Sequence, residues 1–131
     1  MDEHPNVAIL RRLSDQMSGS TNPGDIEAIM NEGLADDVEW HEIGRTEPTI
    51  GKAAMKERVA AGFGDTEIKV DEHDTIANDT HAVQLMNVTA RRGDKTLNYR
   101  TAEIFHMKDG KITARWAFSD DTAAIMEFFG S

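Results

Sequence analysis

Two glutamates are candidate acid–base groups because each interrupts an otherwise apolar row in a predicted strand. From Leu97 to Met107 the odd-numbered positions form an apolar face that contains one carboxylate, Glu103. In the stretch from Asp36 to Ile43, Glu42 alternates onto the same side as Val38 and Trp40. A carboxyl group on an apolar wall has its ionised form disfavoured, which suits it to donate or accept a proton near neutral pH. The pattern predicts a catalytic pair made of Glu103 and Glu42.

Structural roles are the alternative for the same residues. Each glutamate can instead be a residue at the edge of the sheet or the ion-pair partner of one of three arginines, namely Arg45, Arg100 or Arg115. His41 is the third catalytic candidate, but by alternation it faces away from Trp40 and Glu42. We expect a structural or interfacial role for His41 unless a β-bulge turns its side chain inward.

Metal and cofactor sites find little support in the sequence. Cysteine is absent, which excludes disulfides and thiolate ligands. His41-Glu42 begins like a zinc-protease motif, but no second histidine follows at the required spacing. Gly62 and Gly64 follow a predicted helix rather than a strand, which is wrong for a phosphate-binding loop. We expect no metal and no cofactor.

The composition limits the possible partners. The 131 residues include 14 Lys and Arg against 24 Asp and Glu, a formal net charge of -10. The basic residues are scattered, so nucleic acid and anionic membranes are poor partners. No apolar run approaches the roughly 18 residues that span a bilayer. We expect one domain, residues 1–131, in a soluble cytoplasmic protein.

Helical spacing of apolar residues predicts three helices before the long strands. The first has its apolar residues three or four positions apart and stops near Gly19, and the second opens at Pro23. A strand over residues 36–43 and a loop over 44–51 precede the third helix, over residues 52–63. The apolar face of the first helix consists of Val7, Leu10, Leu13 and Met17.

From Glu67 onward the pattern has period two, which predicts four antiparallel strands and a short C-terminal helix. Asp109-Gly110 is a strong signal for a two-residue hairpin, because both residues tolerate a positive φ. The return strand is predicted to place Ile112, Ala114, Trp116 and Phe118 on one face. Helices followed by a meander of strands indicate an α+β fold with the helices on one face of the sheet.

This order of elements resembles the nuclear transport factor two-like superfamily, most closely its SnoaL-like polyketide cyclase group and more distantly ketosteroid isomerase. The resemblance implies a cone-shaped, curved antiparallel sheet wrapped by N-terminal helices around an apolar pocket. The residues that carry it are Gly24-Asp25, Val38 to His41, Thr46-Glu47-Pro48, Gly51, Glu103 to Phe105, and Asp109 to Ile112 continuing to Trp116.

The resemblance also points to the two glutamates. In ketosteroid isomerases the catalytic base lies six residues before the proline of a Glu-Pro pair, which corresponds to Glu42 ahead of Pro48. A second acidic group precedes the last hairpin and corresponds to Glu103, which is also the match to the acidic side chain of SnoaL-like cyclases. Ketosteroid isomerases also have a tyrosine on the first helix that donates a hydrogen bond to the oxyanion, and the matching position in this sequence is about Leu13. Tyr99 is the one tyrosine of this sequence.

The sequence therefore predicts a cofactor-independent acid–base enzyme, of cyclase or isomerase type, acting on a small apolar, polyketide- or steroid-like molecule. The alternative is a non-catalytic small-molecule-binding or scaffold domain of the same fold. The residues expected to hold the small molecule are Leu13, Met17, Trp40, Met55, Tyr99, Thr101, Phe105 and Trp116.

A homodimer is also expected. Period two leaves Val83, Leu85, Ala102 and Ile104 facing away from the pocket side. Such a surface is too apolar to remain exposed to water. Proteins of the resembled superfamily commonly pair sheet to sheet, which implies the same arrangement.

Overall fold

Six strands form one curved sheet in the order β2-β1-β6-β5-β4-β3 in the computed structural model, which describes residues 4–17, 23–62 and 66–129. The strands are β1 Leu34–Trp40, β2 Thr49–Ile50, β3 Glu67–Ala77, β4 His81–Arg92, β5 Lys95–Lys108 and β6 Lys111–Ser119. The helices are α1 Pro5–Met17, α2 Pro23–Gly33, α3 Lys52–Gly62 and α4 Thr122–Phe129. The α+β fold class predicted from the sequence is confirmed.

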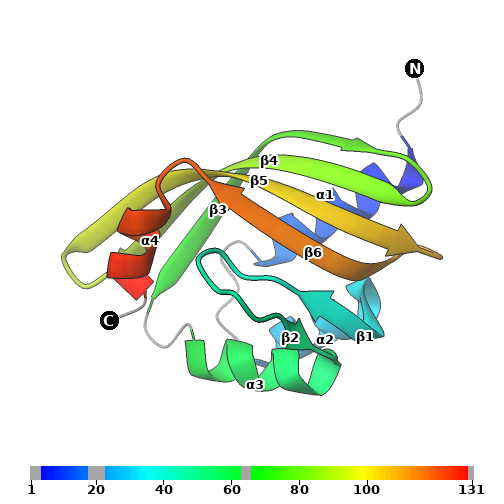
Figure 1. Cartoon of the computed structure of the whole chain (residues 1–131), viewed down its shortest axis with the longest axis horizontal. Helices are drawn as coiled ribbons and strands as arrows, with labels where there is room; N and C mark the ends of the chain where they lie inside the picture. The colour runs from blue at the N-terminus through cyan, green and yellow to red at the C-terminus, as the bar shows by residue number, and fades with distance from the viewer. Residues whose placement is uncertain (1–3, 18–22, 63–65, 130–131) are drawn as a thin grey trace.

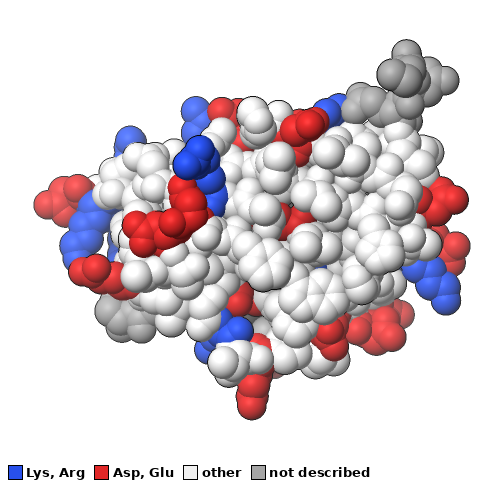
Figure 2. Space-filling view, turned by 45° about the horizontal axis from the view of Figure 1, so that its top comes forward, with Lys and Arg blue, Asp and Glu red and all other residues white. Residues whose placement is uncertain are grey.

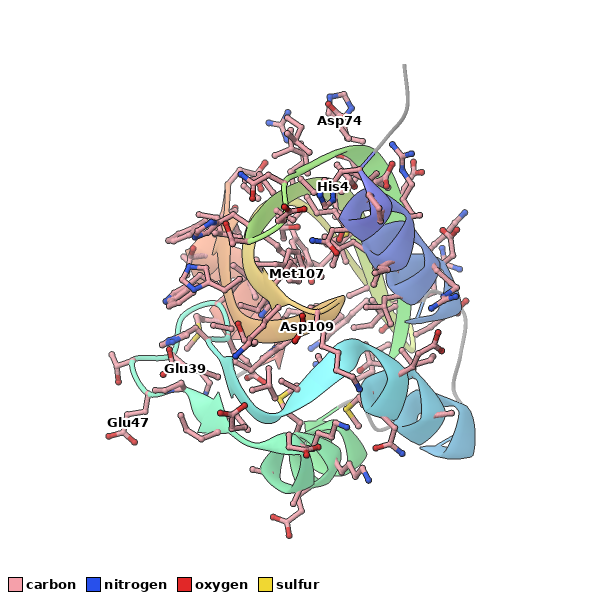
Figure 3. All side chains as sticks on the ribbon, turned by 90° about the vertical axis from the view of Figure 1, so that its right-hand side faces the viewer. His4, Glu39, Glu47, Asp74, Met107 and Asp109 are labelled. Carbon is pink, nitrogen blue, oxygen red and sulfur yellow. The ribbon has the colours of Figure 1, made fainter. Side chains whose placement is uncertain are left out.

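The sheet curls around the N-terminal helices. Figure 1 shows β3 to β6 running together over the top of the molecule, with α2 and α3 below and α4 at one end of the sheet. Seen end-on, β5 and β6 curve around one side of the interior and α1 closes the other, with Met107 pointing into the space between them (Figure 3). The sheet therefore has a concave face toward the helices and an outer face away from them.

The hydrophobic core lies on the concave side. Leu10, Val38, Phe105 and Ile112 are each 3 % exposed or less. Burying an aliphatic or aromatic side chain of this size contributes roughly 1.5–3 kcal/mol, so this cluster holds helices and sheet together. The predicted apolar face of α1 is confirmed for Val7, Leu10 and Leu13, whereas the side chain of Met17 lies outside the described residues.

Two tight turns connect β4, β5 and β6. Asp109 and Gly110 have φ angles of 52° and 77°, as the predicted hairpin between β5 and β6 requires. Gly93 adopts a φ of 62° between β4 and β5. These short connections keep β4, β5 and β6 in direct antiparallel pairing.

A β-bulge at Thr113 overturns the predicted facing of β6. His106 pairs with Ala114 but Met107 pairs with Ile112, so Thr113 is the extra residue on β6. Ile112 therefore faces the core, while Trp116 lies opposite Ile104 on the outer face. The prediction that Ile112 and Trp116 share one face is wrong, because the bulge shifts the alternation by one residue.

The first strand also differs from the prediction. It ends at Trp40 instead of Ile43, and it pairs with β6 in parallel, with Trp40 beside Arg115. Residues 41–48 form the loop that leads to β2. None of the described helices is long and apolar enough to cross a membrane.

Candidate active site

Glu103 is the buried carboxylate of the concave face. It lies on β5, 7 % exposed, in the alternating row that also contains Tyr99 and Thr101. Arg115 donates to Glu103 Oε1 from Nε at 2.9 Å and from Nη2 at 2.8 Å. The hydroxyl of Thr101 donates to the other oxygen, Oε2, at 3.2 Å. The two residues that bind the carboxylate come from adjacent strands. Among the described residues, Oε2 therefore has fewer donors than Oε1.

Arg115 links this carboxylate to the end of β1. Its Nη1 donates to the backbone carbonyl oxygen of His41 at 3.0 Å, and its guanidinium carbon lies 4.5 Å from the centre of the Trp40 ring. A guanidinium can make such contacts at once because its donors lie in a fixed planar fork. Trp40 thus lies on the concave side beside Glu103, where the sequence predicts it.

Tyr99 stays protonated in this environment. Burial, with a smaller contribution from the Glu103 carboxylate, raises the pKa of Tyr99 to about 12, and Arg115 opposes the rise. At neutral pH the phenol is therefore a hydrogen-bond donor on the same face as the Glu103 carboxyl group.

Gln84 is a polar neighbour that the sequence analysis missed. It pairs with Glu103 across β4 and β5, is 2 % exposed, and its Nε2 donates to Ser14 Oγ at 3.3 Å. The sequence does contain a signal for Gln84, because it is the one polar residue in a row of even-numbered positions on β4 that is otherwise apolar. The apolar residues of this row are Ala82, Met86, Val88 and Ala90.

Glu42 does not lie where the alternation predicted. Because β1 ends at Trp40, Glu42 belongs to the following loop, where its Oε2 lies 3.6 Å from Arg45 Nη1. It helps to line a depression of about 290 Å³ together with Trp116 and Phe118 of β6. The ion-pair alternative for the glutamates is realised in both cases, but with different arginines, Arg45 for Glu42 and Arg115 for Glu103. A catalytic pair made of the two glutamates stays a prediction.

His41 and Trp116 lie together on the outer face. Their rings stack at 4.8 Å with an interplanar angle of 13°, and His41 Nε2 lies 2.8 Å from Glu39 Oε2. Only the backbone carbonyl of His41 reaches the arginine that holds Glu103. The prediction that Trp116 lines the concave face is corrected by the bulge at Thr113, and the His41 ring points outward as its alternation indicated.

The remaining predicted contact residues divide between the site and the core. Thr101 bonds directly to Glu103. Leu13, Met55 and Phe105 are 9 %, 4 % and 3 % exposed and belong to the central hydrophobic cluster. They form the apolar floor of the cone, and their contact with a ligand stays a prediction.

The arrangement is suited to proton transfer. A carboxylate oxygen that no arginine binds among the described contacts can accept a proton, and a neutral phenol can stabilise negative charge that develops on a substrate oxygen. In the described ranges 4–17, 23–62 and 66–129, no group of three or more His, Asp or Glu side chains is arranged to hold a metal ion.

Solved structures of other proteins share the fold. A protein assigned as a SnoaL-like polyketide cyclase from Jannaschia sp. CCS1 superposes with a TM-score of 0.79 at 16 % identity, covering 96 % of this chain and 95 % of that one. TerC, co-crystallised with polyporic acid, gives 0.77 at 23 % identity and covers 98 % and 100 %. An LEH-like epoxide hydrolase from M. tuberculosis gives 0.66 at 18 % identity and covers 90 % and 83 %.

Sequence comparison identifies the family. No curated protein matches the chain. The model of the SnoaL-like domain matches residues 15–115, a range that contains β1 to β5, the helices α2 and α3, and both members of the Glu103–Arg115 pair. The chain belongs to the SnoaL-like domain family.

Proposed function

We propose that this protein catalyses cofactor-independent proton transfer on a small, apolar, ring-bearing molecule bound against the concave face. The observation that carries the proposal is the burial of Glu103 with Oε1 bonded by Arg115 and Oε2 bonded by Thr101 alone among the described contacts. Arg115 holds the carboxylate in a fixed orientation, and Oε2 is the oxygen that accepts the proton.

The chemistry proposed is abstraction of a proton from a carbon next to a carbonyl group. The C–H bond breaks, its proton passes to Glu103 Oε2, and the electron pair moves onto the carbonyl oxygen to give an enolate. The Tyr99 phenol donates a hydrogen bond to that oxygen. Where the enolate is conjugated to a C=C bond, return of the proton from Glu103 to the far carbon of that bond gives isomerisation. Where the enolate carbon instead attacks a second carbonyl group and closes a ring, the alkoxide that forms takes the proton back from Glu103.

The aromatic residues support an apolar substrate. Trp40 and Tyr99 line the region beside Glu103, and the core cluster with Phe105 lies below it. Apolar and aromatic walls with few polar groups are typical of sites for small ring-bearing molecules. Polyporic acid, the compound co-crystallised with TerC, is a suitable first probe.

Two measurements test the proposal. Ligands are first selected by thermal shift from a panel of polyporic acid and enolisable polyketide-, terpenoid- and steroid-like ketones, because a ligand that binds the native state raises the melting temperature. Selected ketones are then followed by NMR in D2O for exchange at the carbon next to the carbonyl. We expect Glu103→Gln to slow exchange roughly 10²–10⁴-fold, the range for loss of a general base, with little change in affinity.

Glu72→Gln is the matched control. Glu72 is also a partly buried glutamate bonded by an arginine, since Arg11 Nε lies 2.8 Å from its Oε2. This variant should leave the exchange rate within about twofold, because Glu72 contacts α1 and not the Glu103 site. Ligand binding without exchange in the wild-type protein would overturn the catalytic proposal in favour of a small-molecule-binding domain.

We also propose that two copies associate through the outer face. Ile76, Val83 and Phe118 are 62 %, 36 % and 55 % exposed there, although all three are apolar. Figure 2 shows a broad, largely uncharged expanse over this face, with the Lys, Arg, Asp and Glu side chains gathered mainly at its edges. Because each copy carries a formal net charge of -10, two copies approach with least repulsion where both surfaces carry few carboxylates.

A further inference from the structure

Three histidines lie in a row on the outer face, with Trp116 between two of them. We call His81, His106 and His41 the histidine row. The rings of His81 and His106 are 4.6 Å apart in an edge-to-face arrangement, the His106 ring is 4.8 Å from Trp116, and Trp116 stacks on His41. The row crosses β4, β5, β6 and the end of β1, in direct continuation of the exposed apolar side chains.

We infer that the histidine row makes self-association through the outer face dependent on pH, with the dimer favoured when the row is neutral and weakened when it is protonated. This inference rests on the proposed dimer. Neutral imidazole rings pack on an apolar surface as flat aromatic groups. Protonated rings carry charge, and an apolar interface can bury a charge only at a substantial cost.

The surroundings decide which members of the row carry this effect. His41 Nε2 lies 2.8 Å from the Glu39 carboxylate, so a positive charge on His41 is compensated within the same copy. His81 and His106 contact each other, so protonation of both places two positive charges side by side. We therefore assign the effect mainly to His81 and His106.

Other charged groups lie near the row, and most of them have partners of their own. Asp79, two residues before His81, has its Oδ1 2.6 Å from His4 Nε2. On β3, Asp74 pairs with Leu85, and on β5, Lys108 is two residues beyond His106 and adds positive charge. Glu42 is in the loop after β1 and forms its ion pair with Arg45. At the far end of β5 and β6, Arg100 and Asp120 pair with each other.

The experiment is sedimentation equilibrium of the full chain between pH 8 and pH 5.5, a range that spans the usual titration of histidine near pH ~6.5. A salt concentration of about 0.3 M screens the overall negative charge, which would otherwise fall with pH and favour association by itself. We expect a dimer at pH 8 and a dissociation constant at least tenfold higher at pH 5.5.

Variants identify the residues responsible. His106→Gln and His81→Gln remove the titrating group and keep a neutral polar side chain, so each should reduce the change in the dissociation constant between the two pH values. His73→Gln is the matched control, because His73 is an exposed histidine at the bulge of β3, outside the row. The control should retain the full pH dependence.

The measurements distinguish the pH dependence of the dimer from the existence of the dimer itself. A monomer at every pH would overturn the dimer and with it the role of the histidine row. A dimer whose dissociation constant is the same at pH 8 and pH 5.5, or one whose pH dependence survives in His81→Gln/His106→Gln, would overturn the inference and leave the dimer in place.

Discussion

Arg115 holds three groups at once: the Glu103 carboxylate, the His41 carbonyl oxygen and the face of the Trp40 ring. Its side chain and that of Glu103 are 12 % and 9 % exposed. Two charges this far from water are tolerated because each compensates the other. Removing only one of the two side chains would therefore leave the other charge buried without compensation.

We expect Arg115→Met to lower the free energy of unfolding by about 3–5 kcal/mol, the usual cost of breaking a buried ion pair from one side. Arg115→Met combined with Glu103→Leu should recover most of that loss, because the remaining charge is gone as well. Chemical denaturation of the wild type, both single variants and the double variant measures the coupling. Additive losses would show that the two residues stabilise the fold independently.

The single tyrosine makes the electrostatics of the site directly measurable. Absorbance of tyrosinate followed through a pH titration should give a midpoint near the pKa of about 12 for Tyr99, compared with 10.0 for the free side chain. Glu103→Gln should lower the midpoint, because the carboxylate contributes to the raised pKa. A midpoint near 10 would place Tyr99 in solvent and remove its proposed role.

The same shift predicts how stability changes in alkali. A raised pKa in the folded state means that the native protein holds the phenol proton more tightly than the unfolded chain does. The associated stability is therefore fully present below pH 10 and is lost as the pH rises toward 12. Tyr99→Phe should remove this part of the pH dependence, which denaturant titrations at several alkaline pH values would measure.

At the scale of elements, turns were predictable and bulges were not. Asp109-Gly110 has a local signature, because only a few residues tolerate positive φ at both positions of a short hairpin. The bulge at Thr113 has no such signature, since it depends on how β6 pairs with both β5 and β1. One unpaired residue moved Trp116 to the outer face, and the end of β1 at Trp40 removed the basis for the predicted facing of Glu42.

The loop between β1 and β2 packs against α4 through Gly44. Its φ is 80°, and a Cβ atom there would lie 2.2 Å from Met126 Sδ. Gly44→Ala should therefore lower the free energy of unfolding by about 1–3 kcal/mol, part from the left-handed backbone and part from displacing Met126.

Gly93→Ala separates the two causes. Gly93 has a φ of 62°, but a Cβ atom would meet nothing within 4 Å. We expect a smaller loss at Gly93 than at Gly44, and the difference should shrink when Met126→Ala is combined with Gly44→Ala. Equal losses in the two glycine variants would mean that α4 does not press on this loop. Thermal or chemical denaturation is sufficient for the comparison.

At the scale of the whole molecule, α1 completes the cone by packing across the concave side of β3 and β4. Polar contacts fix both ends of this packing: Asn6 donates to the carbonyl oxygen of Asn78 at 2.9 Å, and Arg11 binds Glu72. Between them Leu10 is 2 % exposed. The helix therefore acts as one wall of the interior instead of a surface attachment.

Leu10→Ala tests this role of α1. Loss of a fully buried leucine costs roughly 2–5 kcal/mol, depending on how far the cavity collapses. We expect a decrease in that range, together with faster amide hydrogen exchange in β3 and β4, which α1 covers. A loss near zero would show that α1 contributes little to holding the sheet in its curved form.

The architecture could be predicted because it rests on patterns that are local in sequence: the apolar face of α1, the alternating rows of β4 and β5, and the turn at Asp109. The site was predicted in part. Glu103 was found from its position in an apolar row, but the choice of Arg115 over Arg45 or Arg100 depends on strand pairing. Gln84 and Ser14 come together only when α1 packs on the sheet.

Strand β6 separates the Glu103 site from the outer face by a single layer of backbone. Arg115 points inward to Glu103, and the next residue, Trp116, points outward and stacks on His41. The backbone carbonyl oxygen of His41 in turn accepts a hydrogen bond from Arg115. A substitution on the outside of the sheet can therefore alter the geometry of the carboxylate without touching the interior. Libraries designed to change which molecules this protein accepts should include the outward-facing positions of β6 as well as the residues beside Glu103.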